Sequence, residues 1–140
     1  MEILKIKTEK RRLGDLGERA AAKYLRTHGY KILERGYVGE DSEIDIICSS
    51  RDTVAFVEVK TRSVEAESPM EERPASAVTP EKQRKILKAA AIYRSFNPSD
   101  KKMRFDVVEV LVREGKVERI NHLIGTFDRD TAYLPPWKRR

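Results

Sequence analysis

The amino-acid sequence predicts a single α/β domain in which helices flank a mixed β-sheet. Its length of 140 residues is enough for one hydrophobic core but not for two. With 39% hydrophobic and 37% charged residues, the chain is too apolar for wholesale disorder and has an ordinary globular composition. Helical and strand patterns follow one another in the order αβββαββ, which favours a mixed sheet covered by helices.

The chain opens with a basic stretch followed by a helical pattern. We expect residues 1–10 to be a basic N-terminal lead-in and the folded domain to span residues 11–125. Between Arg11 and His28, apolar residues recur at steps of three and four, as on one face of an amphipathic helix. These residues are Leu13, Leu16, Ala20 and Tyr24. We therefore predict a helix here, with Gly29 as its C-terminal cap.

Three strand patterns follow this helix. Residues Tyr30–Tyr37 are expected to form a short strand, and residues 39–42 a polar turn. The segments Glu43–Cys48 and Thr53–Lys60 both alternate and are rich in β-branched residues. Because a polar link separates them, we predict an antiparallel hairpin.

The middle of the chain contains an irregular segment and a second helix. Residues 62–78 contain two prolines and no periodicity, which indicates a mobile surface loop. Thr79 is predicted to be the N-cap of the second helix and Pro80 its first residue. We expect this helix to end near Phe96, ahead of an Asn-Pro breaker.

Two further strands are predicted near the C-terminus. Met103–Val112 is strongly apolar, and Val117–Leu123 follows it after a turn containing glycine. Residues 126–140 are expected to form a C-terminal tail. Trp137 and the basic residues 138–140 have the composition of a base-stacking segment, although a disordered tail is the prediction we favour for them.

Charge and cysteine content indicate the compartment and the partner. The net charge of +6 favours a polyanionic partner, because neutralising phosphates releases counterions. No apolar run reaches the roughly 18 residues that a bilayer crossing needs, and no secretory signal is apparent. The one cysteine, Cys48, cannot form an internal disulfide, so we expect a cytoplasmic protein with no membrane partner. By strand alternation Cys48 shares a face with Ile44 and Ile46, which predicts a buried thiol.

The predicted hairpin brings charged side chains together. If its turn is centred on residues 51–52, Asp45 lies directly opposite Glu58, and Glu43 lies opposite Lys60. The second pair is easily explained as a cross-strand ion pair on a solvated face. The first is not, because like charges directly opposite one another are destabilising.

Two explanations of the opposed carboxylates remain open from the pattern alone. Asp45 and Glu58 are either both well solvated, or they jointly ligate a cation such as Mg²⁺ or Mn²⁺, which hard oxygen ligands suit. Glu18 lies at the edge of the apolar stripe of the first helix. It is either a third carboxylate of the same site or an ordinary residue at the helix boundary.

An ordered set of motifs along nearly the whole chain resembles one protein family. The motifs are Gly14–Glu18, Gly29-Tyr30, Glu43–Ile47, Phe56–Arg62, Lys82 with Ala90, Arg104–Val108 and Ile120–His122. They resemble the UPF0102 (YraN) family of small bacterial proteins, which is related to Holliday-junction resolvases. The family is part of the PD-(D/E)XK nuclease superfamily.

The resemblance implies a fold and a role for each matching residue. The fold would be the restriction-endonuclease-like mixed sheet. Asp45 and Glu58 would ligate Mg²⁺ or Mn²⁺, with Glu18 as a supporting ligand and the backbone carbonyl of Val59 as another. Lys60 would orient the attacking water or neutralise charge on the phosphate. The implied activity is metal-dependent endonucleolytic hydrolysis of DNA, on branched or single-stranded substrates, by metal-activated water.

Three residues are predicted to contact nucleic acid. Lys82 and Gln83 lie near the N-terminus of the second helix, where anions are attracted; a solvated basic face explains them equally well. Arg62 follows the second hairpin strand and is expected to contact a phosphate. Resolvase-like nucleases often act as dimers, so a homodimer is compatible with the resemblance.

Three other functions compete with the nuclease. A nucleic-acid-binding module that retains the fold without cutting is the main alternative. An RNA-cleaving enzyme of the tRNA-splicing-endonuclease type would need a metal-free Tyr, His and Lys set, which the sequence does not show in order. A purely structural scaffold would leave the opposed carboxylates without a role.

Overall fold

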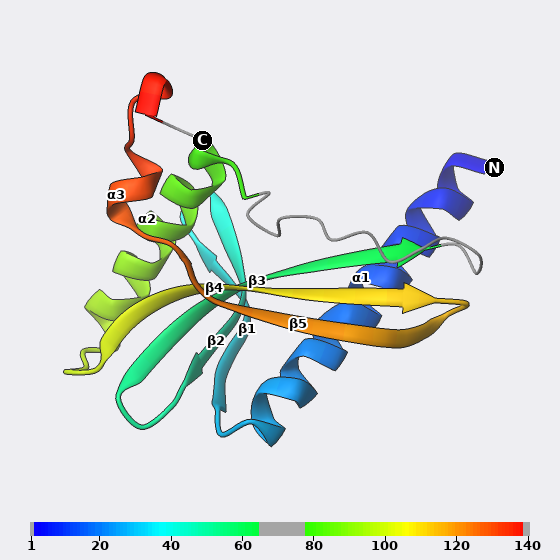
Figure 1. Ribbon diagram of the computed structural model, residues 1–140, viewed down its shortest axis with the longest axis horizontal. Coiled ribbons are helices and arrows are strands. Elements are labelled where there is room, and N and C mark those ends of the chain that lie inside the picture. The colour runs from blue at the N-terminus through cyan, green and yellow to red at the C-terminus, as the bar shows by residue number, and fades with distance from the viewer. Residues whose placement is uncertain (1, 65–77, 139–140) are drawn as a thin grey trace.

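The computed structural model describes residues 2–64 and 78–138. Its centre is a five-stranded sheet in the spatial order β1-β2-β3-β4-β5 (Figure 1). The strands are β1 (Lys31–Gly39), β2 (Ser42–Ser49), β3 (Thr53–Val64), β4 (Lys102–Arg113) and β5 (Lys116–Phe127). The β3–β4 pair is parallel and the other three pairs are antiparallel. The sheet is therefore mixed, as predicted.

Two long helices cover opposite faces of this sheet (Figure 1). On one face α1 (Glu2–Thr27) packs Ala21, Ala22 and Leu25 against buried valines of β3 and β4. On the other face α2 (Pro80–Phe96) packs Ile86 and Ala90 against a second cluster that contains the phenylalanines of the sheet. The single α/β domain with flanking helices is confirmed.

The first helix is longer than the sequence pattern indicated. It begins at Glu2, so the expected basic lead-in of residues 1–10 is helical over nearly its whole length. This stretch has no proline or glycine, and its lysines, glutamates and leucine are good helix formers. At the other end Gly29 has φ +91°, and the Tyr30 N–H donates to the Leu25 carbonyl at 3.0 Å. This αL cap confirms the prediction for Gly29.

The second helix follows its predicted caps closely. The Thr79 hydroxyl accepts a hydrogen bond from the Lys82 N–H at 3.1 Å, and Pro80 occupies the first turn. The helix ends at Phe96, with Asn97 as its C-cap. Of the loop predicted over residues 62–78, residues 62–64 continue β3, and residues 65–77 lie outside the described residues.

The C-terminal region is more structured than a tail. The β4–β5 turn places Glu114 and Gly115 at φ 52° and 75°, as a two-residue hairpin turn requires. Beyond the predicted end at Leu123, β5 continues to Phe127. The short helix α3 (Arg129–Ala132) and the 3₁₀ turn η1 (Pro136–Lys138) follow, and α3 packs against α2 (Figure 1).

One strand departs from the predicted alternation of faces. Ile46 and Cys48 lie in the core cluster on the α1 side, whereas Ile44 lies with Ile47 in the cluster on the α2 side. The expectation that Ile44 and Ile46 share a face is therefore wrong, although Cys48 is buried as predicted. The strand changes course between these residues: β2 leaves β3 beyond the Ile46–Val57 pair, and Gly36, opposite Asp45 in the β1 register, has φ +62°.

A buried carboxylate stabilises the sheet near α1. Asp106 is 0% exposed, and its oxygens accept hydrogen bonds from Arg104 and from the Gly125 N–H. The His122 Nε2 lies 2.8 Å from Oδ2. Burial alone would raise the pKa of Asp106, but the hydrogen bonds from His122, Arg104 and the Gly125 N–H outweigh it and lower the pKa below its ordinary 3.8.

Within the described residues, no helix has the length and apolar character that a bilayer crossing requires.

Candidate functional site

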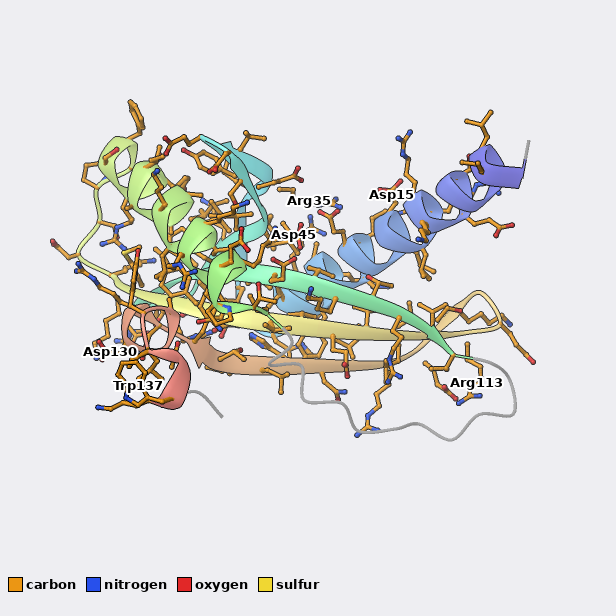
Figure 2. The ribbon with its side chains drawn as sticks, turned by 90° about the horizontal axis from the view of Figure 1, so that it is seen from above. Asp15, Arg35, Asp45, Arg113, Asp130 and Trp137 are labelled. Atoms are coloured by element: carbon orange, nitrogen blue, oxygen red, sulfur yellow. The ribbon has the colours of Figure 1, made fainter. Side chains whose placement is uncertain are left out.

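A cleft opens between α1 and the diverging strands β2 and β3. Its volume is about 530 Å³, and α1 and β3 supply most of its lining. All four side chains predicted to carry catalysis line it, namely Glu18, Asp45, Glu58 and Lys60. Val59, predicted to offer its carbonyl, lines it as well. Figure 2 shows Asp45 and Arg35 lying beside α1.

The pairing of the hairpin explains how the cleft forms. The ladder between β2 and β3 runs from Ser49–Val54 to Ile46–Val57, which is the register expected from the turn. In that register the next pair would be Asp45–Glu58, and this is where β2 leaves β3. Instead of a further ladder bond, the Asp45 Oδ2 accepts the Val59 N–H at 2.8 Å. The two carboxylates therefore stand at a fork in the sheet.

The predicted ion pair beyond this point does not form. Among the ion pairs of residues 2–64 and 78–138, none joins Glu43 to Lys60. The two strands have already separated at these positions, so the residues are no longer cross-strand neighbours. Lys60 instead lines the cleft, where its charge acts on Glu58.

The environment of Glu58 makes its charged form unfavourable. Its side chain is only 12% exposed. Burial and the neighbouring Asp45 carboxylate raise the pKa of Glu58 from its ordinary 4.5 to about 7, against the opposing effects of Lys82 and Lys60. Lys82 Nζ lies 4.0 Å from Glu58 Oε2. Glu58 therefore keeps its proton to a higher pH than an ordinary glutamate does.

The first helix adds a third carboxylate. Burial and the charge of Asp45 raise the pKa of Glu18 above its ordinary 4.5, while Arg35 acts in the opposite direction. Arg35 lies on β1 opposite Ile46, so β1 contributes a cation to the surroundings of the site. Sequence reasoning did not single out Arg35, because its closeness to Glu18 depends on how α1 packs across the sheet.

A glycine allows α1 to approach the strand that carries the site. A Cβ atom on Gly17 would lie 1.8 Å from the Thr61 Oγ1, so no other residue fits there without a shift of the helix. This contact brings Glu18, the next residue, to the edge of the cleft. The sequence offered Gly17 only as part of a motif, and its packing role becomes visible once Thr61 is placed.

The residues predicted to contact nucleic acid lie in different surroundings. Lys82 lies near the carboxylates, as described above. The amide of Gln83 is used within the fold, because it donates to the Val78 carbonyl at 2.9 Å and accepts from the Thr131 hydroxyl at 3.2 Å. Arg62 follows the cleft on β3, is half-buried, and lies beside Leu111 of β4.

The donor set at the fork suits a hard divalent cation. Carboxylates and a peptide carbonyl are the oxygen ligands that Mg²⁺ and Mn²⁺ prefer. A cation would also offset both the burial and the Asp45 charge that raise the pKa of Glu58. Among the described residues, no three acidic, histidine or cysteine side chains are gathered around one point. The residues fit the metal in chemistry, and Asp45 and Glu58 are the two best placed to hold it.

Comparison with known proteins assigns the chain to a family. Residues 17–110 match the model of "Uncharacterised protein family UPF0102". A UPF0102 protein of Syntrophomonas wolfei is 46% identical over 119 residues, which cover 84% of this chain and 98% of that protein. Another, from Chlorobium phaeobacteroides, is 44% identical and covers 84% and 87%. A third, from Caldanaerobacter subterraneus, is 40% identical and covers 86% and 98%. With a matching family model and relatives of this identity over nearly their full length, the chain belongs to the UPF0102 family.

Proposed function

We propose that this protein is a metal-dependent endonuclease that hydrolyses DNA phosphodiester bonds. The observation that carries the proposal is the pair of carboxylates, Asp45 and Glu58, at the fork between β2 and β3. Two carboxylates this close destabilise the fold, and the pKa of Glu58 is raised to about 7. A cation bound by both would remove this cost. The arrangement also resembles the PD-(D/E)XK nucleases, in which a hairpin supplies two acidic residues and a lysine.

Each residue of the cleft has a task in this reaction. Asp45, Glu58, the Val59 carbonyl and Glu18 would hold Mg²⁺ or Mn²⁺. When bound, such an ion polarises the phosphate and makes water a better nucleophile. Lys60 orients the attacking water and compensates negative charge that develops on the phosphate oxygens. No covalent intermediate with the protein is required.

The cations around the carboxylates support binding of the substrate. Lys82 lies at the edge of the acidic pair, where its ammonium group can contact a phosphate next to the one that is cleaved. Arg62 extends the same strand beyond Lys60. The net charge of +6 adds a non-specific attraction for polyanions that weakens with added salt.

The test is cleavage of labelled single-stranded, duplex, flap and four-way-junction DNA with Mg²⁺, Mn²⁺ or EDTA. Asp45→Asn and Lys60→Ala variants are purified identically, so that a contaminating nuclease is exposed. Asp100→Asn is the control, because Asp100 is an exposed carboxylate away from the cleft. We expect cutting that requires metal, is lost in the first two variants and persists in Asp100→Asn.

The same assay decides between the nuclease and the binding module. Absence of cutting on every substrate, together with tight binding by wild type and Asp45→Asn alike, contradicts the nuclease proposal. Retained or improved binding by the Asp45→Asn variant would then favour a non-catalytic protein, since loss of a carboxylate reduces repulsion of phosphate.

A further inference from the structure

The C-terminal segment presents two exposed aromatic side chains. Tyr133 directly follows α3 and is 62% exposed, and Trp137 in η1 is 81% exposed. Single exposed aromatics are common on protein surfaces and need no explanation. Tyr133 differs because it lines two clefts that also contain basic side chains, and Trp137 follows it by four residues, next to Lys138 of the second cleft. Figure 2 shows Trp137 at the opposite side of the molecule from Asp15 of α1.

The segment before Tyr133 is anchored. Asp128 and Thr131 form a capping box at the start of α3, and Ala132 is fully buried. The Arg84 Nη1 of α2 donates to the Ala132 carbonyl at 2.8 Å. Tyr133 is therefore held in place by α2 and is already oriented before any ligand arrives, which lowers the entropic cost of binding.

Tyr133 stands between two clefts. One has a volume of about 760 Å³ and lies between α2, β4 and α3. The other, about 500 Å³, lies on the C-terminal side of α3. Tyr133 and Arg129 line both. Each volume is within the range of about 300–1,000 Å³ that is usual for small-ligand sites.

Cations outnumber acids in the lining of these clefts. The basic residues are Arg84, Lys85, Lys88, Arg129 and Lys138, and the acidic ones are Asp41, Glu81 and Asp130. The guanidinium of Arg84 lies 5.8 Å from the centre of the Tyr133 ring. Aromatic faces set among cations are the features with which proteins bind unpaired nucleotides.

We propose that this surface, formed by Tyr133, Trp137, Arg129, Lys85 and Lys138 and called here the α3 platform, binds a single-stranded segment of nucleic acid. Bases stack on the two aromatic rings, and the three cations neutralise phosphates. A duplex hides the faces of its bases, so it cannot use the rings in this way. The inference rests on the proposed function, because it takes the substrate of the cleft to be nucleic acid.

The platform and the carboxylate cleft are connected through one helix. Lys82 of α2 lies 4.0 Å from Glu58, while Arg84 and Lys85, within the following turn of the same helix, line the larger platform cleft. A strand held on the platform can therefore lead along α2 towards the carboxylates. This placement predicts that the substrates are DNA molecules with an unpaired tail or flap.

The chain offers a direct spectroscopic probe of the platform. Trp137 is its one tryptophan, so quenching of tryptophan emission by oligo-dT reports contact at this surface. The titration uses the full chain in EDTA, so that nothing is cut. We expect quenching in wild type, and an affinity about tenfold weaker in Tyr133→Ala, as the loss of one stacked base predicts. Tyr133→Phe keeps the ring and should bind like wild type.

Two controls separate stacking from general electrostatics. Phe96→Ala removes a comparably exposed ring, 77% exposed, from the far end of α2 and should leave affinity unchanged. An abasic strand of equal length keeps the phosphates, and Tyr133→Ala should not weaken its binding. Equal weakening for the abasic and oligo-dT strands would overturn base stacking.

The outcomes distinguish this inference from the proposed function. Cleavage by wild type with unchanged oligo-dT affinity in Tyr133→Ala overturns the platform and leaves the nuclease intact. Binding that depends on Tyr133, without cutting on any DNA, overturns the nuclease and supports the platform. If wild type neither binds nor cuts any strand, both proposals are wrong.

Discussion

Replacing Glu58 by glutamine should stabilise the metal-free protein while it abolishes cleavage. Glutamine has nearly the shape of the protonated acid but never ionises. In the wild-type protein, burial and Asp45 raise the pKa of Glu58 to about 7, whereas an unfolded glutamate titrates near 4.3. The folded protein therefore holds a proton that the unfolded chain releases, and wild-type stability falls as the pH rises between these two values.

The size of the effect follows from the two pKa values. Each tenfold difference in acid dissociation corresponds to roughly 1.4 kcal/mol, so the ordinary 4.5 and the raised value of about 7 set an upper bound of about 3 kcal/mol. Water that reaches the cleft reduces this value, so we expect roughly 1–3 kcal/mol. For a chain of this size, each kcal/mol of added stability raises the melting temperature by about 3–5 °C.

The assay is thermal unfolding of wild type and Glu58→Gln in EDTA between pH 4.5 and 8. The variant should match wild type at the acid end and be more stable above pH 7, where the wild-type carboxyl is ionised. Asp100→Asn, an exposed control away from the cleft, should show no such pH-dependent gain. A Glu58→Gln protein that is no more stable than wild type at pH 8 refutes the reasoning.

The same pair of proteins also measures metal binding without reference to cleavage. A ligand that binds only the folded state stabilises it by about 2.7 kcal/mol at a hundred times its dissociation constant. Added Mn²⁺ should therefore raise the melting temperature of wild type at pH 8 and reverse the order of the two proteins. A similar rise in Glu58→Gln would mean that the ion binds elsewhere.

Three further predictions concern the scaffold. Gly17→Ala should destabilise the protein by about 1–3 kcal/mol, because its methyl group meets Thr61. Gly14→Ala, with open space around its Cβ, should stabilise it by up to about 1 kcal/mol. Urea unfolding compares the two variants, and equal effects would contradict the close approach of α1 to β3 at Gly17. Asp106→Asn should lower the free energy of unfolding by about 3–5 kcal/mol at pH 5–8. The loss should be smaller below about pH 4, because a carboxylate with a lowered pKa stabilises the wild type only while it is ionised; thermal unfolding across this pH range tests it. Burial raises the pKa of Cys48 to about 12, so a thiol reagent should label it only after denaturation, and rapid labelling of the native protein would disprove its burial.

Sequence reasoning succeeded where the signals were local. The caps of α2 depend on Thr79 and Pro80, which act on the residues next to them. The β2–β3 register depends on the length of one turn, and the ladder from Ser49–Val54 to Ile46–Val57 follows it. In both cases the information lies within a few residues of the feature, so no knowledge of the rest of the fold was needed.

The errors arose where contacts distant in sequence decided the outcome. Ile44 packs on the α2 side because the strand changes course at Asp45, where β2 leaves β3 and Gly36 of β1 has φ +62°. The short helix α3 has too little periodicity to be recognised, and it is held by the bond from Arg84 to Ala132 across 48 positions of the chain. Arg35 was missed for the same reason, since its influence on Glu18 requires β1 and α1 to be placed first.

The opposed carboxylates connect the predicted register with the observed departure from it. Had the ladder continued past Ile46–Val57, Asp45 and Glu58 would have faced each other as direct cross-strand neighbours, at an electrostatic cost. The strands part at this pair, and Asp45 accepts the Val59 N–H in place of the next ladder bond. The separation opens the cleft, yet burial and the charge of Asp45 still raise the pKa of Glu58. Local rules of sheet structure are most often broken at functional sites, and here the break and the unrelieved charge occur at the same two residues. A bound cation would account for both.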